Sequence, residues 1–299
     1  MDRLLRREME AIARDSRSGA AELALQAVTA LQAWLRRHSK PSEQELLEIA
    51  RALLTAQPSM APLLRLANEV ALAVDSARPA RTLAEATAGF GRLLRSAPQR
   101  IARLFGRALG PGRTQFLATY SYSSTVVRAL QFARRRIAVV LCSESRPGNE
   151  GRATASQLVA AGTPVIFSTD LALASRMDQV SVFATGADAI LPHGFVNKAG
   201  TDVLIACARK AHTSVWVLAD TTKFVPQSMA TRLWIERAGK ESAIWQQAPA
   251  GVRISNPLFE PAPFFSAIRV LTERGWMRPK DVREELRKIR VSPRLRTLG

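Results

Sequence analysis

Apolar residues recur at helical spacing through the first part of the chain. Between Ala20 and Leu35, five of them fall on one face of a helix: Leu23, Ala24, Ala27, Leu31 and Leu35. Ser42 and Glu45 have the spacing of a capping box, which predicts the start of another helix. Prolines punctuate further helices at Pro58, Pro62, Pro79, Pro98 and Pro111. No alternating β-branched run occurs before about residue 114, so the pattern predicts a helical N-terminal domain over residues 1–112.

The pattern changes after Gly110-Pro111-Gly112. Short apolar runs follow at Gln115–Thr119, Ile137–Cys142, Pro164–Ser168, Val180–Thr185 and Val215–Ala219. Helical patterns separate them, near 124–135, 151–161, 171–178 and 199–212, and 263–290 also has a helical pattern. Short apolar strands that alternate with helices are typical of a parallel sheet covered on both faces. Residues 113–299 are therefore predicted to form a mostly parallel, doubly wound α/β domain.

Composition excludes several classes of protein. The 299 residues contain no run of about 18 apolar positions, so no membrane-spanning helix is expected. The charged stretch Met1–Arg7 is unlike a signal peptide, and two cysteines cannot form a disulfide framework, so we expect a cytoplasmic protein. Neither a Cys/His cluster nor a GxGxxG or GxxxxGK[ST] motif occurs, and we expect no metal and no cofactor.

The chain is strongly basic, with 43 Lys and Arg against 25 Asp and Glu. The net charge of +18 is spread over both predicted domains. Such a charge would suit nucleic acid, and it would equally attract small anionic molecules. We favour the simpler interpretation of a solvated basic surface.

Polar residues gather where the predicted strands end. Ligands of open α/β sheets bind at the carboxyl ends of the strands. Arg146, Lys198 and Lys223 all follow predicted strands and fall on this edge. A guanidinium, ammonium groups and helix N-termini together suit a phosphate. Each residue alone could equally be a cap or part of a surface ion pair, whereas the set predicts a phosphate-binding crevice.

Several motifs in these segments carry a resemblance to a known family. They are Glu144-Ser145-Arg146-Pro147 through Glu150-Gly151-Arg152, Gly186-Ala187-Asp188-Ala189-Ile190, Asn197-Lys198-Ala199-Gly200-Thr201, Lys223-Phe224, Asn256-Pro257-Leu258-Phe259 and, more weakly, Arg17-Ser18-Gly19-Ala20. The chain resembles the family that joins the α, β and δ regulatory subunits of translation initiation factor 2B with two sugar-phosphate isomerases. Those isomerases act on 5-methylthioribose-1-phosphate and ribose-1,5-bisphosphate. The resemblance implies a helical N-terminal domain on a Rossmann-like domain, assembled as a homodimer or larger homo-oligomer.

The resemblance also implies roles for single residues. Residues that would hold phosphate and sugar hydroxyls are Arg17, Gly19, Arg146, Asn197 and Lys198. Asp188 matches the aspartate that the isomerases use for proton transfer. Ser121 stands where the isomerases carry a catalytic Cys, and Tyr120 stands where they carry a His. A thiol exchanges a proton near neutral pH, whereas an alcohol needs an adjacent base.

Three functions fit these observations. The first is an initiation-factor-2B-like protein that binds a phosphorylated sugar or nucleotide in a regulatory role without converting it. The second is an aldose–ketose isomerase that uses Asp188 with a partner other than Cys. The third is a nucleic-acid or protein interaction module that has lost its ligand. Because Ser121 replaces the thiol, we favour the first and expect little or no isomerase turnover.

Overall fold

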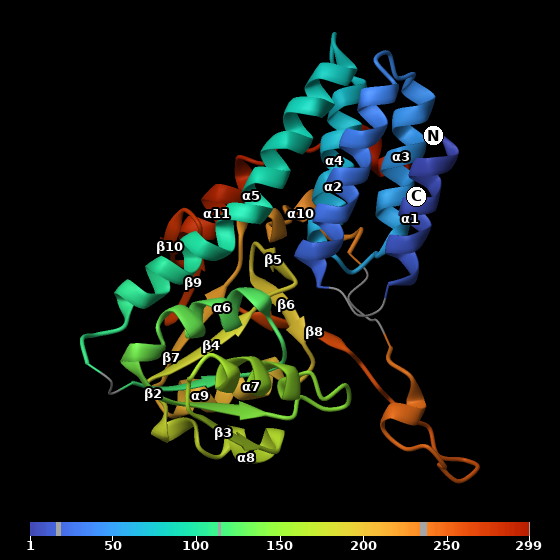
Figure 1. Ribbon diagram of the computed structural model, residues 1–299. Helices are drawn as coiled ribbons and strands as arrows, with labels where there is room; N and C mark the ends of the chain where they lie inside the picture. Colours follow the sequence, from blue (N-terminus) through green and yellow to red (C-terminus); the bar gives the residue numbers. More distant parts are fainter. Residues whose placement is uncertain (16–18, 113–114, 234–237, 299) are drawn as a thin grey trace. The chain divides into compact units, whose positions relative to one another are not determined.

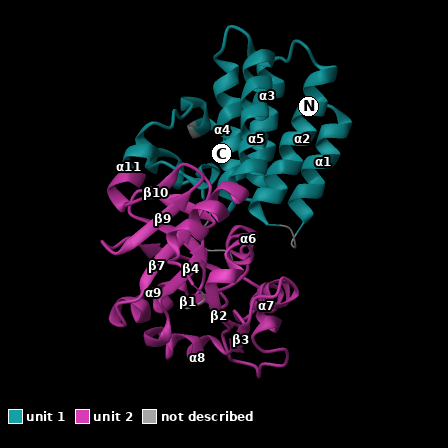
Figure 2. Cartoon of the chain, turned by 60° about the vertical axis from the view of Figure 1, so that its left-hand side comes forward, with its two compact units in different colours: residues 1–97, 221–234, 283–299 teal, residues 98–220, 235–282 magenta. Residues whose placement is uncertain are grey.

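Two units, each assembled from separated segments of the chain, make up the structure (Figure 2). The computed structural model describes residues 1–15, 19–112, 115–233 and 238–298. Unit 1 comprises residues 1–97, 221–234 and 283–299, and unit 2 comprises residues 98–220 and 235–282. The chain therefore leaves each unit and later returns to it.

Unit 1 is helical, as the apolar spacing predicts. Its helices are α1 (Arg3–Arg14), α2 (Ala20–Arg37), α3 (Glu43–Ala56), α4 (Ala61–Val74), the first part of α5 (Pro79–Ala108), the short α10 (Gln227–Ala230) and the last part of α11 (Pro279–Arg287). The predicted face of α2 is buried at Leu23, Ala27 and Leu31. The capping box at Ser42 and Glu45 is present. Pro98 does not end a helix, because α5 continues through it.

Side chains of α4 hold the returning segments of unit 1. The buried Asn68 donates from Nδ2 to the carbonyl of Arg290 at 2.9 Å, and its Oδ1 accepts from the amide of Ser292 at 2.9 Å. Arg65 donates from Nη1 to the carbonyl of Phe224 at 2.8 Å. These side chains thus form hydrogen bonds with backbone groups of irregular segments, which lack the regular backbone hydrogen bonds of a helix or sheet.

Unit 2 is built on a seven-stranded sheet with the order β10-β9-β7-β4-β1-β2-β3 (Figure 1). The strands are β1 (Gln115–Thr119), β2 (Ile137–Ser143), β3 (Val165–Ser168), β4 (Val182–Gly186), β7 (Ser214–Leu218), β9 (Ile268–Thr272) and β10 (Gly275–Met277). All neighbours pair in parallel except β10, which is antiparallel to β9. Helices α6 (Ser124–Phe132), α7 (Gly151–Ala160), α8 (Asp170–Ala174) and α9 (Thr201–Lys210) connect the strands. The predicted mostly parallel, doubly wound α/β fold is confirmed.

Unit 2 also contains a small antiparallel sheet, whose strands come between those of the seven-stranded sheet in the sequence. It contains β5 (Ala189–Leu191), β6 (Gly194–Lys198) and β8 (Phe259–Pro263), in the order β5-β6-β8. The helical expectation for 263–290 is wrong over its first part, because β8 ends there and β9 and β10 follow before α11 begins. Ile268, Val270 and Leu271 are buried in β9, which pairs with β7. Pairing with a strand some fifty positions earlier overrides the local helical pattern.

The core of unit 2 lies between the sheet and its helices. Phe105 of α5 is fully buried and meets the ring of Trp216 in β7 edge-on, with 5.5 Å between ring centres. Trp216 in turn meets Trp276 of β10 at 4.8 Å. This packing fixes the last turns of α5 on the sheet. In the described part of the chain, no helix is long and apolar enough to cross a membrane.

Candidate functional site

The strand order places a switch point between β1 and β4. The chain runs from β1 outward through β2 to β3, and then returns to β4 on the other side of β1. The last residue of β4 lies close to the segment that follows β1 there, because a Cβ on Gly186 would lie 2.7 Å from Oγ of Ser123. A crevice at such a switch point is the usual ligand site of a doubly wound sheet.

The segment after β1 is fixed at Ser121. Its amide donates to Oγ of Ser145 at 2.8 Å, and its carbonyl accepts from Oγ1 of Thr154 at 2.8 Å. Its φ of 63° lies in the left-handed region, which is costly for a residue with a side chain. The half-buried Ser121 is therefore held in an unusual conformation by two neighbouring segments.

The segment after β2 is fixed by a carboxylate. Asp170, the first residue of α8, accepts from the amides of Ser145 and Arg146, each at 2.8 Å, with one carboxylate oxygen for each. The Arg146 side chain is exposed and donates from Nη2 to the carbonyl of Ala243 at 3.2 Å. Arg146, the residue predicted to bind a phosphate, thus has a fixed backbone and an exposed guanidinium.

Lys198 is buried at the end of β6 and pairs with Glu150. Its Nζ lies 2.8 Å from Oε1 of Glu150, and the residue is 4% exposed. The other carboxylate oxygen, Oε2, is buried and has no hydrogen-bond partner among the described residues. Glu150 directly precedes α7, so the pair links the segments after β2 and β6.

Asn197 is oriented by two threonines. Its Nδ2 donates to Oγ1 of Thr185 and to Oγ1 of Thr201, both at 3.0 Å. Both amide protons are used in these bonds, and a ligand hydroxyl would therefore have to donate to Oδ1. Thr201 also donates to the carbonyl of Lys198, at 2.6 Å. The Asn197-Lys198 pair is thus held by the start of α9.

The N-terminus of α9 is occupied by the protein's own carboxylate. Oε1 of Glu260 accepts from the amides of Gly200 at 2.9 Å and Asp202 at 2.8 Å. These two amides at the start of α9 are therefore already bonded, since a carboxylate binds the positive end of the helix dipole.

Tyr120 supports the same region but cannot serve as a base. Its hydroxyl donates to the carbonyl of Ala199 at 2.6 Å. Gly200 has a φ of 98°, and a Cβ there would lie 2.8 Å from the Tyr120 hydroxyl. Burial raises the pKa of Tyr120 above its ordinary value, and the carboxylates of Asp170, Glu150 and Glu260 raise it further.

The remaining predicted site residues lie in both units of the structure. Asp188 follows β4 and is half-buried, and its amide donates to the carbonyl of Val196 at 2.8 Å. Gly19 precedes α2 in unit 1, and Lys223 is buried in unit 1. Arg17 lies outside the described residues. Unit 2 therefore brings together the segments that carry Ser121, Arg146, Asn197 and Lys198.

Sequence reasoning missed two carboxylates that shape the site. Asp170 lies two residues after the end of β3, so the strand-end rule that selected Arg146 would also have found it. Glu260 lies about sixty residues from the helix that it caps, so no local sequence pattern predicts this cap. Among the described residues, no group of three or more His, Cys, Asp or Glu is placed to hold a metal ion.

Known proteins resemble the chain along most of its length. It is 26% identical over 269 residues to the ribose 1,5-bisphosphate isomerase of Methanocaldococcus jannaschii, with 88% of this chain and 87% of the relative covered. It is 33% identical over 185 residues to the methylthioribose-1-phosphate isomerase of Trichoplax adhaerens, with 59% of this chain and 51% of the relative covered. Both relatives carry the name of an isomerase.

A solved structure shows the same fold. The crystal structure of the Pyrococcus horikoshii OT3 translation initiation factor eIF-2B matches with a TM-score of 0.77 at 24% identity, over 94% of this chain and 100% of that one. A model of the initiation factor 2 subunit family matches residues 16–279. The order of the motifs, the switch-point architecture and this match together identify the chain as a member of the initiation factor 2 subunit family.

Proposed function

We propose that the chain binds a phosphorylated sugar at the carboxyl ends of β1, β2 and β4 and interconverts its aldose and ketose forms. The observation that carries the proposal is the hydrogen bond from Ser121 to Ser145, which joins the segments after β1 and β2 at the switch point. Asp188 follows the strand on the other side of that point. The isomerase names of two relatives support the same reaction.

The phosphate would be held by Arg146 and Lys198. The guanidinium of Arg146 is exposed, and its planar fork can bind two phosphate oxygens at once. The ammonium of Lys198 is buried and adds a fixed positive charge. Asn197 would accept a hydrogen bond from a sugar hydroxyl, because the two threonines determine which way its amide faces.

The reaction requires two proton transfers. The bond between C1 and the ring oxygen breaks, and that oxygen takes a proton. The hydrogen of C2 is transferred as a proton to C1, and the C2 hydroxyl becomes a carbonyl as it releases its proton to water, which supplies the proton that the ring oxygen takes. Asp188 would move the proton at carbon as a general base and acid. Ser121 would donate a hydrogen bond to the ring oxygen, since a hydroxyl does not ionise near neutral pH without an adjacent base.

Binding without turnover is the second candidate function. Ser121 favours it, because this residue replaces the thiol that the resembling isomerases carry. Tyr120 cannot supply the missing base, since its pKa is raised above the ordinary value for tyrosine. A phosphorylated sugar would then act as a structural or regulatory ligand.

One experiment separates the two functions. Ribose 1,5-bisphosphate and 5-methylthioribose-1-phosphate are incubated with the protein, and ³¹P NMR follows the ketose 1-phosphate. Turnover that falls by about 10²–10⁴ in Asp188→Asn, with calorimetric binding retained, supports the isomerase. Binding of either substrate without turnover supports the second function. If neither substrate binds, both are wrong.

A further inference from the structure

A long part of the sequence carries positive charge without any negative charge. Between Glu85 and Glu144 there is no Asp, no Glu and no Lys, but there are ten arginines. They are Arg92, Arg95, Arg100, Arg103, Arg107, Arg113, Arg128, Arg134, Arg135 and Arg136. The net charge of the whole chain is +18, so this stretch carries more than half of it.

The fold of unit 2 brings several of these arginines together. The last turns of α5 pack against the end of α6, because the position of a Cβ on Gly106 lies 3.1 Å from the ring of Phe132. Arg136 donates to the carbonyls of Gly106 and Leu109, the latter at 2.9 Å. This half-buried arginine satisfies the C-terminal carbonyls of α5 and fixes Arg134 and Arg135 beside that helix end.

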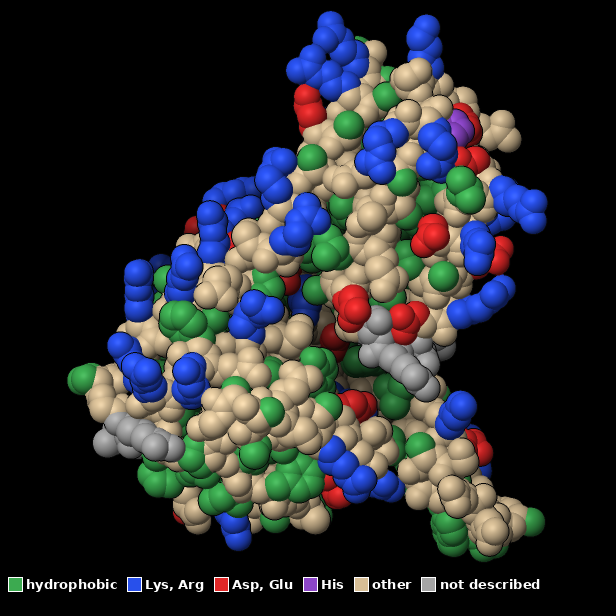
Figure 3. All heavy atoms as spheres, viewed as in Figure 1, with side chains coloured by type: hydrophobic (Ala, Val, Ile, Leu, Met, Phe, Trp, Pro, Cys, Tyr) green, Lys and Arg blue, Asp and Glu red, His purple; other side chains and the backbone are tan. Residues whose placement is uncertain are grey.

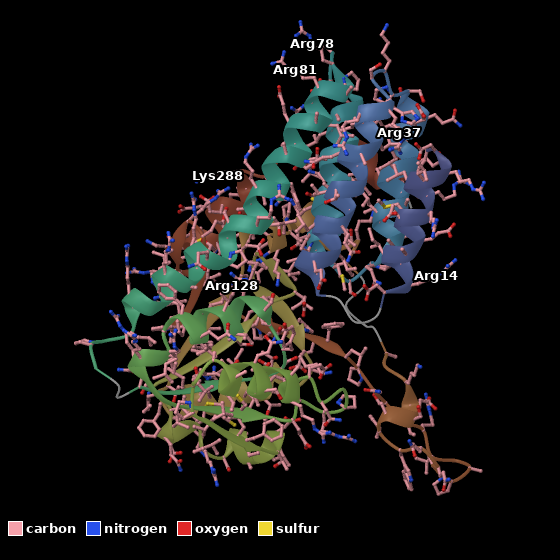
Figure 4. All side chains as sticks on the ribbon, viewed as in Figure 1. Arg14, Arg37, Arg78, Arg81, Arg128 and Lys288 are labelled. Carbon is pink, nitrogen blue, oxygen red and sulfur yellow. The ribbon has the colours of Figure 1, made fainter. Side chains whose placement is uncertain are left out.

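The other arginines of this region remain exposed. We call them the arginine face: Arg100, Arg103 and Arg107 on α5, Arg128 on α6, and Arg134 and Arg135 after α6. Figure 3 shows basic side chains gathered over α5 and α6, and Figure 4 marks Arg128. In the described ranges, no carboxylate forms an ion pair with any of these six side chains.

The arginine face lies away from the candidate sugar-phosphate site. Arg134 and Arg135 immediately precede β2, and Leu109 precedes β1. These residues therefore belong to the amino ends of the parallel strands, whereas the switch-point crevice is at the carboxyl ends. The ligand of the crevice does not account for this charge.

The chemistry of the face fits a polyphosphate backbone. All of its cations are arginines, whose planar guanidinium binds phosphate oxygens in pairs and is weakly hydrated. Arg100, Arg103 and Arg107 recur three and four positions apart, which forms a stripe of roughly 10 Å along α5. Phe132 is 47% exposed beside them and could stack on a base. A membrane-binding face would need several exposed apolar side chains among the basic ones.

We propose that the arginine face binds RNA through its phosphate backbone, independently of the sugar-phosphate site. The binding is electrostatic and tolerant of sequence, and no residue of the face is needed for the chemistry at the switch point. Its affinity must therefore fall steeply as salt concentration rises, because each arginine that neutralises a phosphate releases a counterion.

The test compares two triple variants of equal net charge. One is Arg103→Gln/Arg107→Gln/Arg135→Gln, and the control is Arg7→Gln/Arg209→Gln/Lys210→Gln, whose targets are exposed and lie elsewhere in the fold. Gln keeps a helix propensity close to that of Arg and Lys. Binding of a fluorescein-labelled single-stranded RNA of about 20 nucleotides is followed by polarisation at about 50 to 300 mM salt.

We expect the wild type to bind, the face variant to lose at least about tenfold in affinity, and the slope of log K against log salt to fall by about 2. The control should change by less than about threefold, because it leaves every arginine of the face in place and salt screens exposed charges elsewhere. Equal weakening of both variants, or no binding by the wild type at the lowest salt, overturns the proposal. Binding to anionic phosphatidylserine vesicles but not to RNA also overturns it.

Discussion

The ammonium of Lys198 lies 2.8 Å from a carboxylate oxygen of Glu150, inside the segment that is expected to receive a phosphate. A buried lysine requires a negative partner, and here the protein supplies one before any ligand arrives. An incoming phosphate must share the lysine with this carboxylate. In the proposed site, Glu150 should therefore lower the affinity for a phosphate.

Glu150→Gln should tighten the binding of a phosphorylated sugar. The change removes a negative charge near the phosphate and leaves an amide that can still accept from Lys198. We expect on the order of tenfold higher affinity in isothermal calorimetry, about 1.4 kcal/mol. Asp178→Asn, an exposed carboxylate in the same unit, is the matched control and should have no effect. Weaker binding by Glu150→Gln would mean that the carboxylate itself contacts the ligand.

Arg146→Ala should weaken binding of the same ligand. A charged hydrogen bond contributes about 1.5–3 kcal/mol, so the dissociation constant should rise by tenfold or more. Arg146→Lys should recover only part of the loss, because an ammonium cannot bind two oxygens as a planar fork. Thermal unfolding should be almost unchanged, since the side chain is exposed. Unchanged affinity in calorimetry removes Arg146 from the site.

Gly151→Ala should destabilise unit 2 severely. A Cβ at the start of α7 would overlap the carbonyl oxygen of Ser143, a backbone atom of β2 that cannot move aside. We expect a loss of about 3 kcal/mol or more in the free energy of unfolding.

Gly89→Ala in α5 is the contrasting variant, because the nearest atom to its Cβ would be 3.9 Å away, at the end of the Arg92 side chain. It should stabilise the protein by about 0.5–1 kcal/mol, the helix preference of Ala over Gly. Urea unfolding measures both. Similar effects of the two substitutions would show that α7 does not begin so close to β2.

Stability should fall above about pH 9. Burial raises the pKa of the Cys142 thiol from its ordinary 9.0 to about 12. Between these values the unfolded chain loses this proton and the folded chain keeps it, so unfolding becomes more favourable as pH rises. The raised pKa of Tyr120 acts in the same direction. Each such group contributes a slope of up to about 1.4 kcal/mol per pH unit.

Cys142→Ala should make this alkaline fall less steep, even though it removes packing from the core. Free energies of unfolding in urea at about pH 8 to 11 test the slope. Cys207 is half-buried, and Cys207→Ala serves as the control with the wild-type slope. An identical fall in wild type and Cys142→Ala would assign the effect to other groups.

We predict that the chain forms a homodimer through its α/β unit. The edge strand β3 exposes Ile166 and Phe167, and Leu171 of α8 is 80% exposed nearby in the sequence. Exposed apolar side chains on an edge strand are typical of a surface that another chain covers. Phe259, Phe264 and Phe265 do not form such a surface, because all three are half-buried and Phe264 stacks on Phe195.

Light scattering at micromolar concentration should give twice the mass of the 32.7 kDa chain. Ile166→Lys/Leu171→Lys should then give the single-chain mass while keeping the helical signal in circular dichroism. A single-chain mass for the wild type contradicts the prediction.

The sequence alone determined the elements whose signals are local. The apolar stripe of α2, the capping box of α3 and the short apolar strands β1 to β4 follow from spacing and propensity within a few residues. Because parallel strands present their carboxyl ends at one edge, the same local signals also predicted Arg146 and Lys198 at that edge. Lys198 instead ends β6 of the small antiparallel sheet, and Asn197 was indicated only by the family resemblance.

The tertiary structure decided what these residues do to one another. Lys198 pairs with Glu150, which lies 48 positions earlier in the sequence. The amide of Ser121 donates to the hydroxyl of Ser145, and Glu260 caps a helix that begins about sixty residues before it. The tertiary structure also decided the conformation of β9, which has a helical pattern in the sequence but forms a strand that pairs with β7. Hydrogen bonds and ion pairs act over a few ångströms in space, whatever the separation along the chain, so local patterns cannot encode these partners.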